Sequence, residues 1–185
     1  MIKFKNNMTK KDGITFLVAL CVSAILFLLD LFTKNIITKN IDWGEQITVI
    51  DGFFSISHVH NKGAAWGIFS DYTYILSIAT IFASLLIIYL IYASTSNKII
   101  MTCFSVILGG AGGNLAERIF RGYVTDFLSF NIFGYNFPSF NVADICITVG
   151  CFVLLFYIIF IHKNNTPFFR SGTIAAKVWG DNNGK

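Results

Sequence analysis

The sequence predicts a mainly helical membrane protein with four transmembrane helices and a small antiparallel β element outside the bilayer. Of its 185 residues, 55% are hydrophobic and only 13% are charged. Soluble domains carry roughly 25% charged residues, so this deficit indicates a solvent other than water. Four apolar stretches approach the ~20 residues that a helix needs to cross a bilayer. They cover residues 14–32, 74–92, 99–115 and 145–161.

The first apolar stretch could belong either to a cleaved signal peptide or to a retained span. Lys10 and Lys11 precede it, as they would in a signal peptide. The stretch is long for the apolar region of such a peptide, and no small-residue cleavage site follows it. We therefore expect a retained span, within a single integral-membrane domain over residues 1–163. Residues 164–185 are expected to form a polar, loosely ordered cytoplasmic tail.

The distribution of positive charge predicts the orientation in the membrane. With four spans, one face carries the N-terminus, the loop 93–98 and the C-terminal tail. Nine of the 14 basic residues lie on that face: Lys3, Lys5, Lys10, Lys11, Lys98, Lys163, Arg170, Lys177 and Lys185. Because cytoplasmic loops are enriched in lysine and arginine, both termini are expected in the cytoplasm. No basic patch interleaved with aromatic residues is evident, so membrane lipids rather than nucleic acid are the expected surroundings.

Two long connections lie on the opposite, outer face. In the first, β-rich residues 47–50 and 53–59 flank Asp51-Gly52, which predicts a hairpin. In the second, residues 130–133 and 137–140 flank a turn expected at 134–136. The second connection is too interrupted to cross the membrane, so the chain leaves and re-enters on one face. This places Asp126 and Asp144 at the same depth, near the ends of the third and fourth helices.

Ionisable side chains gather at the outer helix ends. Ionisable groups near hydrocarbon are costly, and each one suggests either a function or an interfacial ion pair. Two carboxylates that lie close together can share a proton, so that one accepts a proton from water while the other donates. This is the chemistry of aspartic peptidases, and it needs no metal. The outer ionisable set is Asp30, Lys34, Glu117, Arg118, Asp126 and Asp144.

Two further patterns carry less chemistry. His58 and His60 share one face of a predicted strand but lack a nearby third histidine, so we expect a plain surface strand and no metal site. Residues 109–113 form a glycine-rich stretch that no Gly-Lys-Ser/Thr follows, which excludes a phosphate loop. Small residues instead allow close helix packing.

Several blocks around these side chains resemble the signature of the bacterial lipoprotein signal peptidases (signal peptidase II). The blocks are DLFTK at 30–34, NKGAAW at 61–66, GNLAER at 113–118, GYVTDF at 122–127 and FNVAD at 140–144. They occur in order, at matching positions relative to the apolar stretches. The resemblance covers residues 14 to 161.

The resemblance implies a cofactor-free aspartic endopeptidase of the bacterial inner membrane, working at the extracytoplasmic face. It implies cleavage of diacylglyceryl-modified prolipoproteins before the lipid-bearing cysteine, inhibition by globomycin, an outer β-cradle and a mobile outer helix. We also expect a monomer. Asp126 and Asp144 match the catalytic dyad. Asn61, Asn114, Arg118 and Asn141 match polar positions that hold substrate or support the dyad. Asp30, Lys34 and Glu117 match structural polar positions.

Some roles stay open at this stage. Arg118 could bind substrate carbonyls or a lipid-linked ester, or it could pair with Glu117 or a lipid phosphate. Asn114 and Asn141 could orient a carboxylate or satisfy backbone groups at a helix end. Trp66 suits the membrane interface and could line the site.

The sequence departs from the family pattern at two positions. Glu117 stands where the family usually has aspartate, which still permits an ion pair or a cap. Leu31 stands where it usually has glutamine, which puts hydrogen bonding near Asp30 in doubt.

Two other classes of function compete with the peptidase. A small proton- or cation-coupled transporter subunit would use Asp30, Asp126 and Asp144 as an ion path. Such proteins place ionisable residues near the bilayer midplane, whereas here the span centres are uncharged. A non-enzymatic assembly factor would tolerate the loss of either Asp126 or Asp144.

Overall fold

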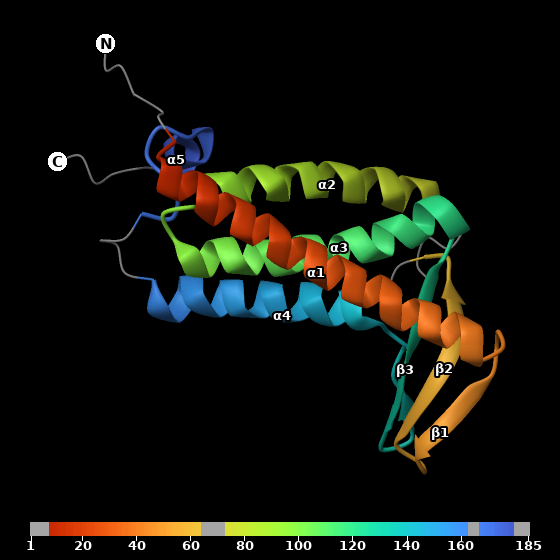
Figure 1. The fold of residues 1–185 in the computed structure, drawn as a ribbon. Helices are drawn as coiled ribbons and strands as arrows, with labels where there is room; N and C mark the ends of the chain where they lie inside the picture. The colour runs from red at the N-terminus through yellow and green to blue at the C-terminus, as the bar shows by residue number, and fades with distance from the viewer. Residues whose placement is uncertain (1–7, 64–72, 163–166, 180–185) are drawn as a thin grey trace.

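Four long helices dominate the computed structural model, which describes residues 8–63, 73–162 and 167–179 (Figure 1). They are α1 (Lys10–Asn40), α2 (Thr73–Ala93), α3 (Lys98–Arg121) and α4 (Val142–Phe156), and a π-helical segment η3 (Tyr157–Ile161) continues α4. All four are long and apolar enough to cross a membrane. The prediction of four membrane helices is confirmed, although α1 and α3 extend beyond the apolar stretches that predicted them.

Helix α3 lies at the centre of the bundle. In α3, 56% of the most apolar 18-residue stretch is buried, whereas the share is 11–17% in the other three helices. Those three helices instead expose large apolar side chains such as Leu28, Phe82 and Phe152. Since hydrocarbon solvates such side chains, their exposure fits a lipid-facing surface around a packed central helix.

Glycines let the neighbouring helices approach α3 closely, as the sequence predicted. A Cβ on Gly109 would lie 2.8 Å from the backbone oxygen of Ser23 on α1. A Cβ on Gly110 would collide with the backbone oxygen of Ala143 on α4, and one on Gly113 with the carboxylate of Asp30. These contacts bring α1, α3 and α4 close together.

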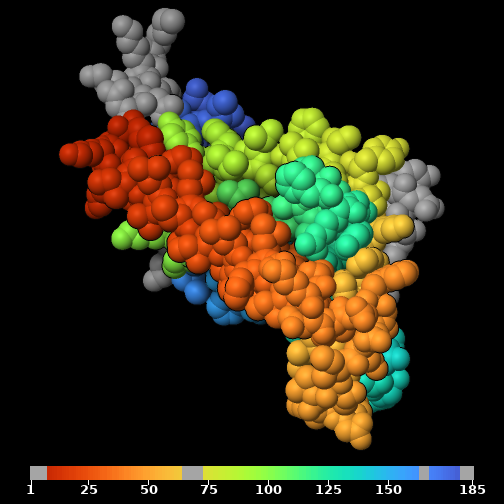
Figure 2. Space-filling model, turned by 45° about the vertical axis from the view of Figure 1, so that its right-hand side comes forward, coloured from red at the N-terminus to blue at the C-terminus, as the bar shows by residue number. Residues whose placement is uncertain are grey.

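A four-stranded antiparallel sheet extends from one end of the bundle (Figures 1 and 2). Its strands are β1 (Gln46–Ile50), β2 (Phe54–Asn61), β3 (Val124–Ile132) and β4 (Tyr135–Asn136), in that order. Apolar contacts hold the sheet against the end of α1, where Ile37 and Ile41 form a buried cluster with Phe127. The small antiparallel element is therefore confirmed, and the predicted Asp51-Gly52 turn joins β1 to β2.

The second hairpin turns one residue earlier than predicted. Phe133 has φ 51° and Gly134 has φ 86°, so these two residues form the turn. Tyr135 and Asn136 belong to β4 instead. Two-residue hairpins favour positive φ at both central positions, and the bulky Phe133 concealed that requirement in the sequence.

The C-terminal segment is more ordered than the sequence suggested. The backbone N–H of Arg170 donates to Ala93 O (2.6 Å), and that of Ala175 donates to Tyr89 Oη (2.8 Å). A short helix, α5 (Ile174–Trp179), follows. The expectation of a loose tail is wrong for residues 167–179, because these contacts fasten it to α2. Helix α5 and the start of α1 lie at the end of the bundle opposite the sheet (Figure 1).

The mobile outer helix that the resemblance implies is not found among the described residues. No short helix lies at the sheet end within residues 8–63 and 73–162. Residues 64–66 of the NKGAAW block, which include Trp66, lie outside the described residues.

The close approach at Gly113 predicts a strong response to a single methyl group. Gly113→Ala should lower the free energy of unfolding by about 1–3 kcal/mol, because the methyl group displaces the buried Asp30 carboxylate. Gly13→Ala, where a Cβ meets nothing within 4 Å, is the matched control. Thermal unfolding in detergent measures both, and equal melting temperatures would contradict the packing argument.

Candidate active site

Asp144 is fixed by the way α4 begins. Asn141 is the N-cap residue, and its side-chain oxygen accepts from the backbone N–H of Asp144 (3.1 Å). Asp144 Oδ2 in turn accepts from the backbone N–H of Asn141 (3.1 Å). This capping box holds the carboxylate in the first turn of the helix.

Asp126 lies on strand β3, five residues after the end of α3, and not at a helix end as the sequence predicted. The chain becomes extended there because Gly122, with φ 77°, ends the helix. Asp126 is 3% exposed. Asn61, at the end of β2, donates to Asp126 Oδ2 (2.9 Å), and Asn141 donates to Oδ1 (2.6 Å).

Two asparagines connect the two carboxylates. Asn141 bonds to Asp126 through its side chain and to Asp144 through its backbone. Asn114, on α3, donates to Asp144 Oδ1 (2.8 Å). Its own oxygen accepts from Asn141 Nδ2 (3.2 Å) and from Lys34 Nζ (2.8 Å). The alternatives left open for Asn141 are therefore both realised, since it caps a helix and also contacts a carboxylate.

A buried ionic cluster supports this network from the bundle side. Lys34 is 1% exposed, and its Nζ lies 2.7 Å from Asp30 Oδ2 and 3.4 Å from Glu117 Oε2. Asp30 Oδ1 accepts from the backbone N–H of Ala143 (2.8 Å). Both Asp30 oxygens thus have partners without an amide at Leu31.

Glu117 acts as a link between α3 and β3. It accepts from the backbone N–H of Thr125 (2.7 Å) and from its hydroxyl (2.8 Å), next to Asp126 in the chain. Arg121 Nη1 lies 2.9 Å from Glu117 Oε1. Sequence reasoning missed Thr125 and Arg121, although Arg121 stands at i+4 from Glu117, the spacing of a helical ion pair.

Arg118 bonds to the segment after β2, whereas Glu117 pairs with Lys34 and Arg121. Its Nη2 donates to Gly63 O (3.1 Å), just after Asn61. Its Nε is buried and has no hydrogen-bond partner among the described residues. A buried unpaired donor is costly, so this guanidinium has capacity for a further acceptor.

A cavity of about 660 Å³ opens beside both aspartates. Its polar end is formed by Asn61, Asn114, Arg118, Asp126 and Asp144. Its remaining wall is largely apolar and comes from α4 and the segment before it: Phe137, Phe140, Ile145, Ile147 and Val149. The cavity therefore suits a molecule with a polar centre and an apolar part.

Burial raises the pKa of Asp126 from its ordinary 3.8 to about 7. Loss of solvent is the largest cause, and the negative charge of Asp144 adds to it. The amide donors of Asn61 and Asn141 lower the pKa but do not offset the burial. One carboxyl of the pair is thus suited to hold a proton near neutral pH.

The histidine pair differs from its prediction. His58 is buried, and its Nδ1 bonds to Ile41 O (2.8 Å). His60 bonds to His58 (Nε2 to Nε2, 3.2 Å) and stacks on Tyr123 (ring centroids 3.6 Å apart). The prediction of a plain surface strand is wrong, because the end of α1 covers His58. Within the described part of the chain, no group of three His, Cys, Asp or Glu side chains could hold a metal ion.

Two carboxylates, joined through asparagines on a half-apolar cavity at the end of a bundle of membrane-length helices, fit an aspartic-type membrane peptidase. Comparison with known proteins gives the family. The profile described as Signal peptidase (SPase) II matches residues 22–160. The chain belongs to the signal peptidase II family.

Relatives and solved structures agree with this assignment. A lipoprotein signal peptidase of Clostridium tetani is 41% identical over 71% of this chain and 86% of its own length. One of Staphylococcus haemolyticus is 38% identical over 85% of this chain and 97% of its own. A bacterial membrane enzyme solved by the in meso method at 2.3 Å resolution superposes with a TM-score of 0.69 at 32% identity, covering 77% of this chain and 87% of that one. Nothing in these comparisons favours a transporter.

The raised pKa of Asp126 predicts how stability depends on pH. Folding favours the protonated form of the Asp126 carboxyl. The stability that this preference adds to the folded protein is complete below about pH 4 and is lost as pH rises through about 7. A shift of about three pKa units corresponds to on the order of 4 kcal/mol. The melting temperature of the wild type should therefore fall more between about pH 5 and pH 8 than that of Asp126→Asn. Parallel curves for the two proteins would contradict the assignment.

The ionic cluster predicts a second effect on stability. Glu117→Gln removes a buried charge that faces Lys34 and should cost about 3 kcal/mol of unfolding free energy. Glu45→Gln, at an exposed position, should change stability by less than about 0.5 kcal/mol. Denaturation of both variants under the same detergent conditions compares them, and a neutral Glu117→Gln would disprove the cluster's structural role.

Proposed function

We propose that this chain removes the signal peptide from diacylglyceryl-modified prolipoproteins by cutting before the lipid-bearing cysteine, with Asp126 and Asp144 as the catalytic pair. The observation that carries the proposal is the arrangement of both carboxylates on one cavity, connected by Asn141 and Asn114. The relatives named above are lipoprotein signal peptidases, which supports the same substrate class.

The two carboxyls take opposite roles in the reaction. Asp126, with its raised pKa, holds the proton and acts as the acid, and Asp144 acts as the base. Asp144 takes a proton from a water molecule, whose oxygen attacks the scissile carbonyl while Asp126 protonates the carbonyl oxygen. When the tetrahedral intermediate collapses, Asp144 gives its proton to the leaving cysteine amine, and Asp126 recovers its own from the intermediate's hydroxyl. The pair thus returns to its starting protonation.

Different walls of the cavity contact different parts of the substrate. Arg118 has a buried donor that no described residue engages, and this donor is available for a peptide carbonyl or the glyceryl ester. Ile147 and Val149 offer an apolar surface toward the lipid-facing side of α4, which suits acyl chains and the signal helix. Asn61 and Asn114 orient the carboxylates rather than the substrate.

The charge distribution supports an orientation. Both ends of the chain face the cytoplasm of a bacterium, and the sheet and cavity face outward from its cytoplasmic membrane. The catalytic unit spans residues 1–163, works as a monomer and needs no metal. A globomycin-type inhibitor competes with prolipoprotein for the cavity.

The catalytic pair predicts the outcome of two isosteric substitutions. Asp126→Asn and Asp144→Asn should each lower cleavage of a lipid-modified prolipoprotein by about a hundredfold or more, because neither amide can transfer the proton. The assay follows the mobility shift of the precursor on gels, with membrane content of the enzyme measured in parallel. Asp42→Asn, at an exposed carboxylate outside the cavity, is the control and should cleave normally.

Normal processing by either aspartate variant would overturn the two-aspartate mechanism. It would favour the assembly-factor alternative instead. Proton or cation flux that depends on Asp126 and Asp144 in sealed vesicles, without cleavage, would favour the transporter.

A further inference from the structure

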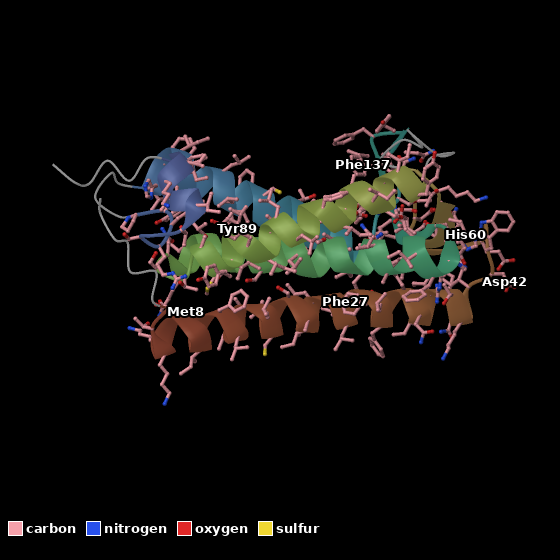
Figure 3. The ribbon with its side chains drawn as sticks, turned by 90° about the horizontal axis from the view of Figure 1, so that it is seen from above. Met8, Phe27, Asp42, His60, Tyr89 and Phe137 are labelled. Atoms are coloured by element: carbon pink, nitrogen blue, oxygen red, sulfur yellow. The ribbon has the colours of Figure 1, made fainter. Side chains whose placement is uncertain are left out.

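A second cavity, of about 500 Å³, lies on the sheet beside the catalytic cavity. The two cavities share Phe137 and Ser139, which lie between strand β4 and helix α4. Phe137 lies at the same end of the molecule as Asp42 and His60, and Met8 lies at the other end (Figure 3). A chain that leaves the catalytic cavity past Phe137 and Ser139 therefore enters this second cavity, which we call the sheet groove.

The sheet groove is lined by a row of hydroxyl groups. Ser57 Oγ lies 2.6 Å from Ser129 Oγ, and Ser129 Oγ lies 2.6 Å from Ser139 Oγ. Thr48 and Ser55 continue the row across strands β1 and β2, where they are cross-strand partners. Each hydroxyl has one donor and two acceptor positions. Linking Ser57, Ser129 and Ser139 by two bonds therefore leaves an excess of acceptors facing the groove.

The charged side chains of the groove have one sign. Among the described residues that line it, only Glu45 and Asp51 are charged, and both are exposed carboxylates. The acceptor-rich floor and the two carboxylates both favour peptide N–H groups and ammonium groups over anions. The groove is also too polar for an acyl chain or an apolar signal helix.

We propose that the sheet groove binds the first residues of the mature lipoprotein, directly after the modified cysteine, and that it selects lysine and small polar residues over acidic ones. This rests on the proposed function. The signal helix and the diacylglyceryl group occupy the bilayer side, so the mature segment is the part of the substrate that leaves toward water. An extended segment presents its backbone donors at regular intervals, which matches a row of hydroxyl acceptors.

The test uses three synthetic diacylglyceryl peptides with the same signal segment. One ends directly after the cysteine, one continues with lysines and serines, and one continues with glutamates and serines. The wild type should cleave the lysine peptide with a kcat/KM about fivefold above that of the glutamate peptide, since exposed charge contacts are individually weak. The ratio should shrink as salt is added.

Substitutions separate the groove from general electrostatics. The double variant Glu45→Gln/Asp51→Asn should bring the ratio of the two long peptides close to one, while it cleaves the short peptide at the wild-type rate. Asp42→Asn removes a nearby carboxylate that does not line the groove and should keep the wild-type ratio. Ser129→Ala should raise the KM of both long peptides and leave that of the short peptide unchanged.

Two results would overturn the inference. One is a wild-type ratio near one, and the other is a ratio that the double variant leaves unchanged. Failure of the proposed function looks different, because the wild type would then cleave none of the three peptides, including the short one that does not reach the groove.

Discussion

The buried ammonium of Lys34 is the group on which the site's geometry depends. It lies on α1, yet it contacts Glu117 and Asn114 on α3, and through Asp30 it is linked to the start of α4. A charge that is 1% exposed is stable only if it is paired and hydrogen-bonded. Three helices must therefore hold fixed positions at this end of the bundle. The glycines of α3 make those positions possible, because they admit the Asp30 carboxylate and the Ala143 carbonyl.

Neutral amides connect this ionic cluster to the carboxylates of Asp126 and Asp144. Asn114 accepts from Lys34 and donates to Asp144, while Asn141 donates to Asp126. A lysine in direct contact with either aspartate would hold that carboxylate ionised. Each asparagine amide fixes the position of the carboxylate that it contacts without adding a charge. Burial therefore still decides the protonation of Asp126. Strand β3 receives the same support from the other side, since Glu117 binds Thr125 immediately before Asp126.

Much of this arrangement was predictable from the sequence, and the failures have physical causes. Apolar stretch length gave the four helices, and the Asp51-Gly52 turn gave the first hairpin. The strand position of Asp126 was missed because Gly122 ends α3 sharply, and hydropathy does not register a left-handed residue. The burial of His58 and Thr125 was missed because it depends on contacts outside their own strands, with Ile41 at the end of α1 and with Glu117 on α3. The ordered segment 167–179 was missed because its contacts to α2 run through Ala93 and Tyr89, which no local pattern marks.

The sheet resolves a conflict between the two requirements of the reaction. Hydrolysis of a lipid-anchored peptide needs water, but paired carboxyls share a proton best where the dielectric constant is low. Strand β3 passes from one environment to the other within a few residues, from the 3% exposed Asp126 to Ser129 at the sheet groove. Phe137 and Ser139 lie where the two environments meet. A helix end alone would place a carboxylate at the interface, but it would offer no ordered polar surface for the product that leaves. Strand β3 provides a buried position for the carboxylate of Asp126 and a polar surface at Ser129, because one part of the strand packs against the bundle and the next part belongs to the open sheet.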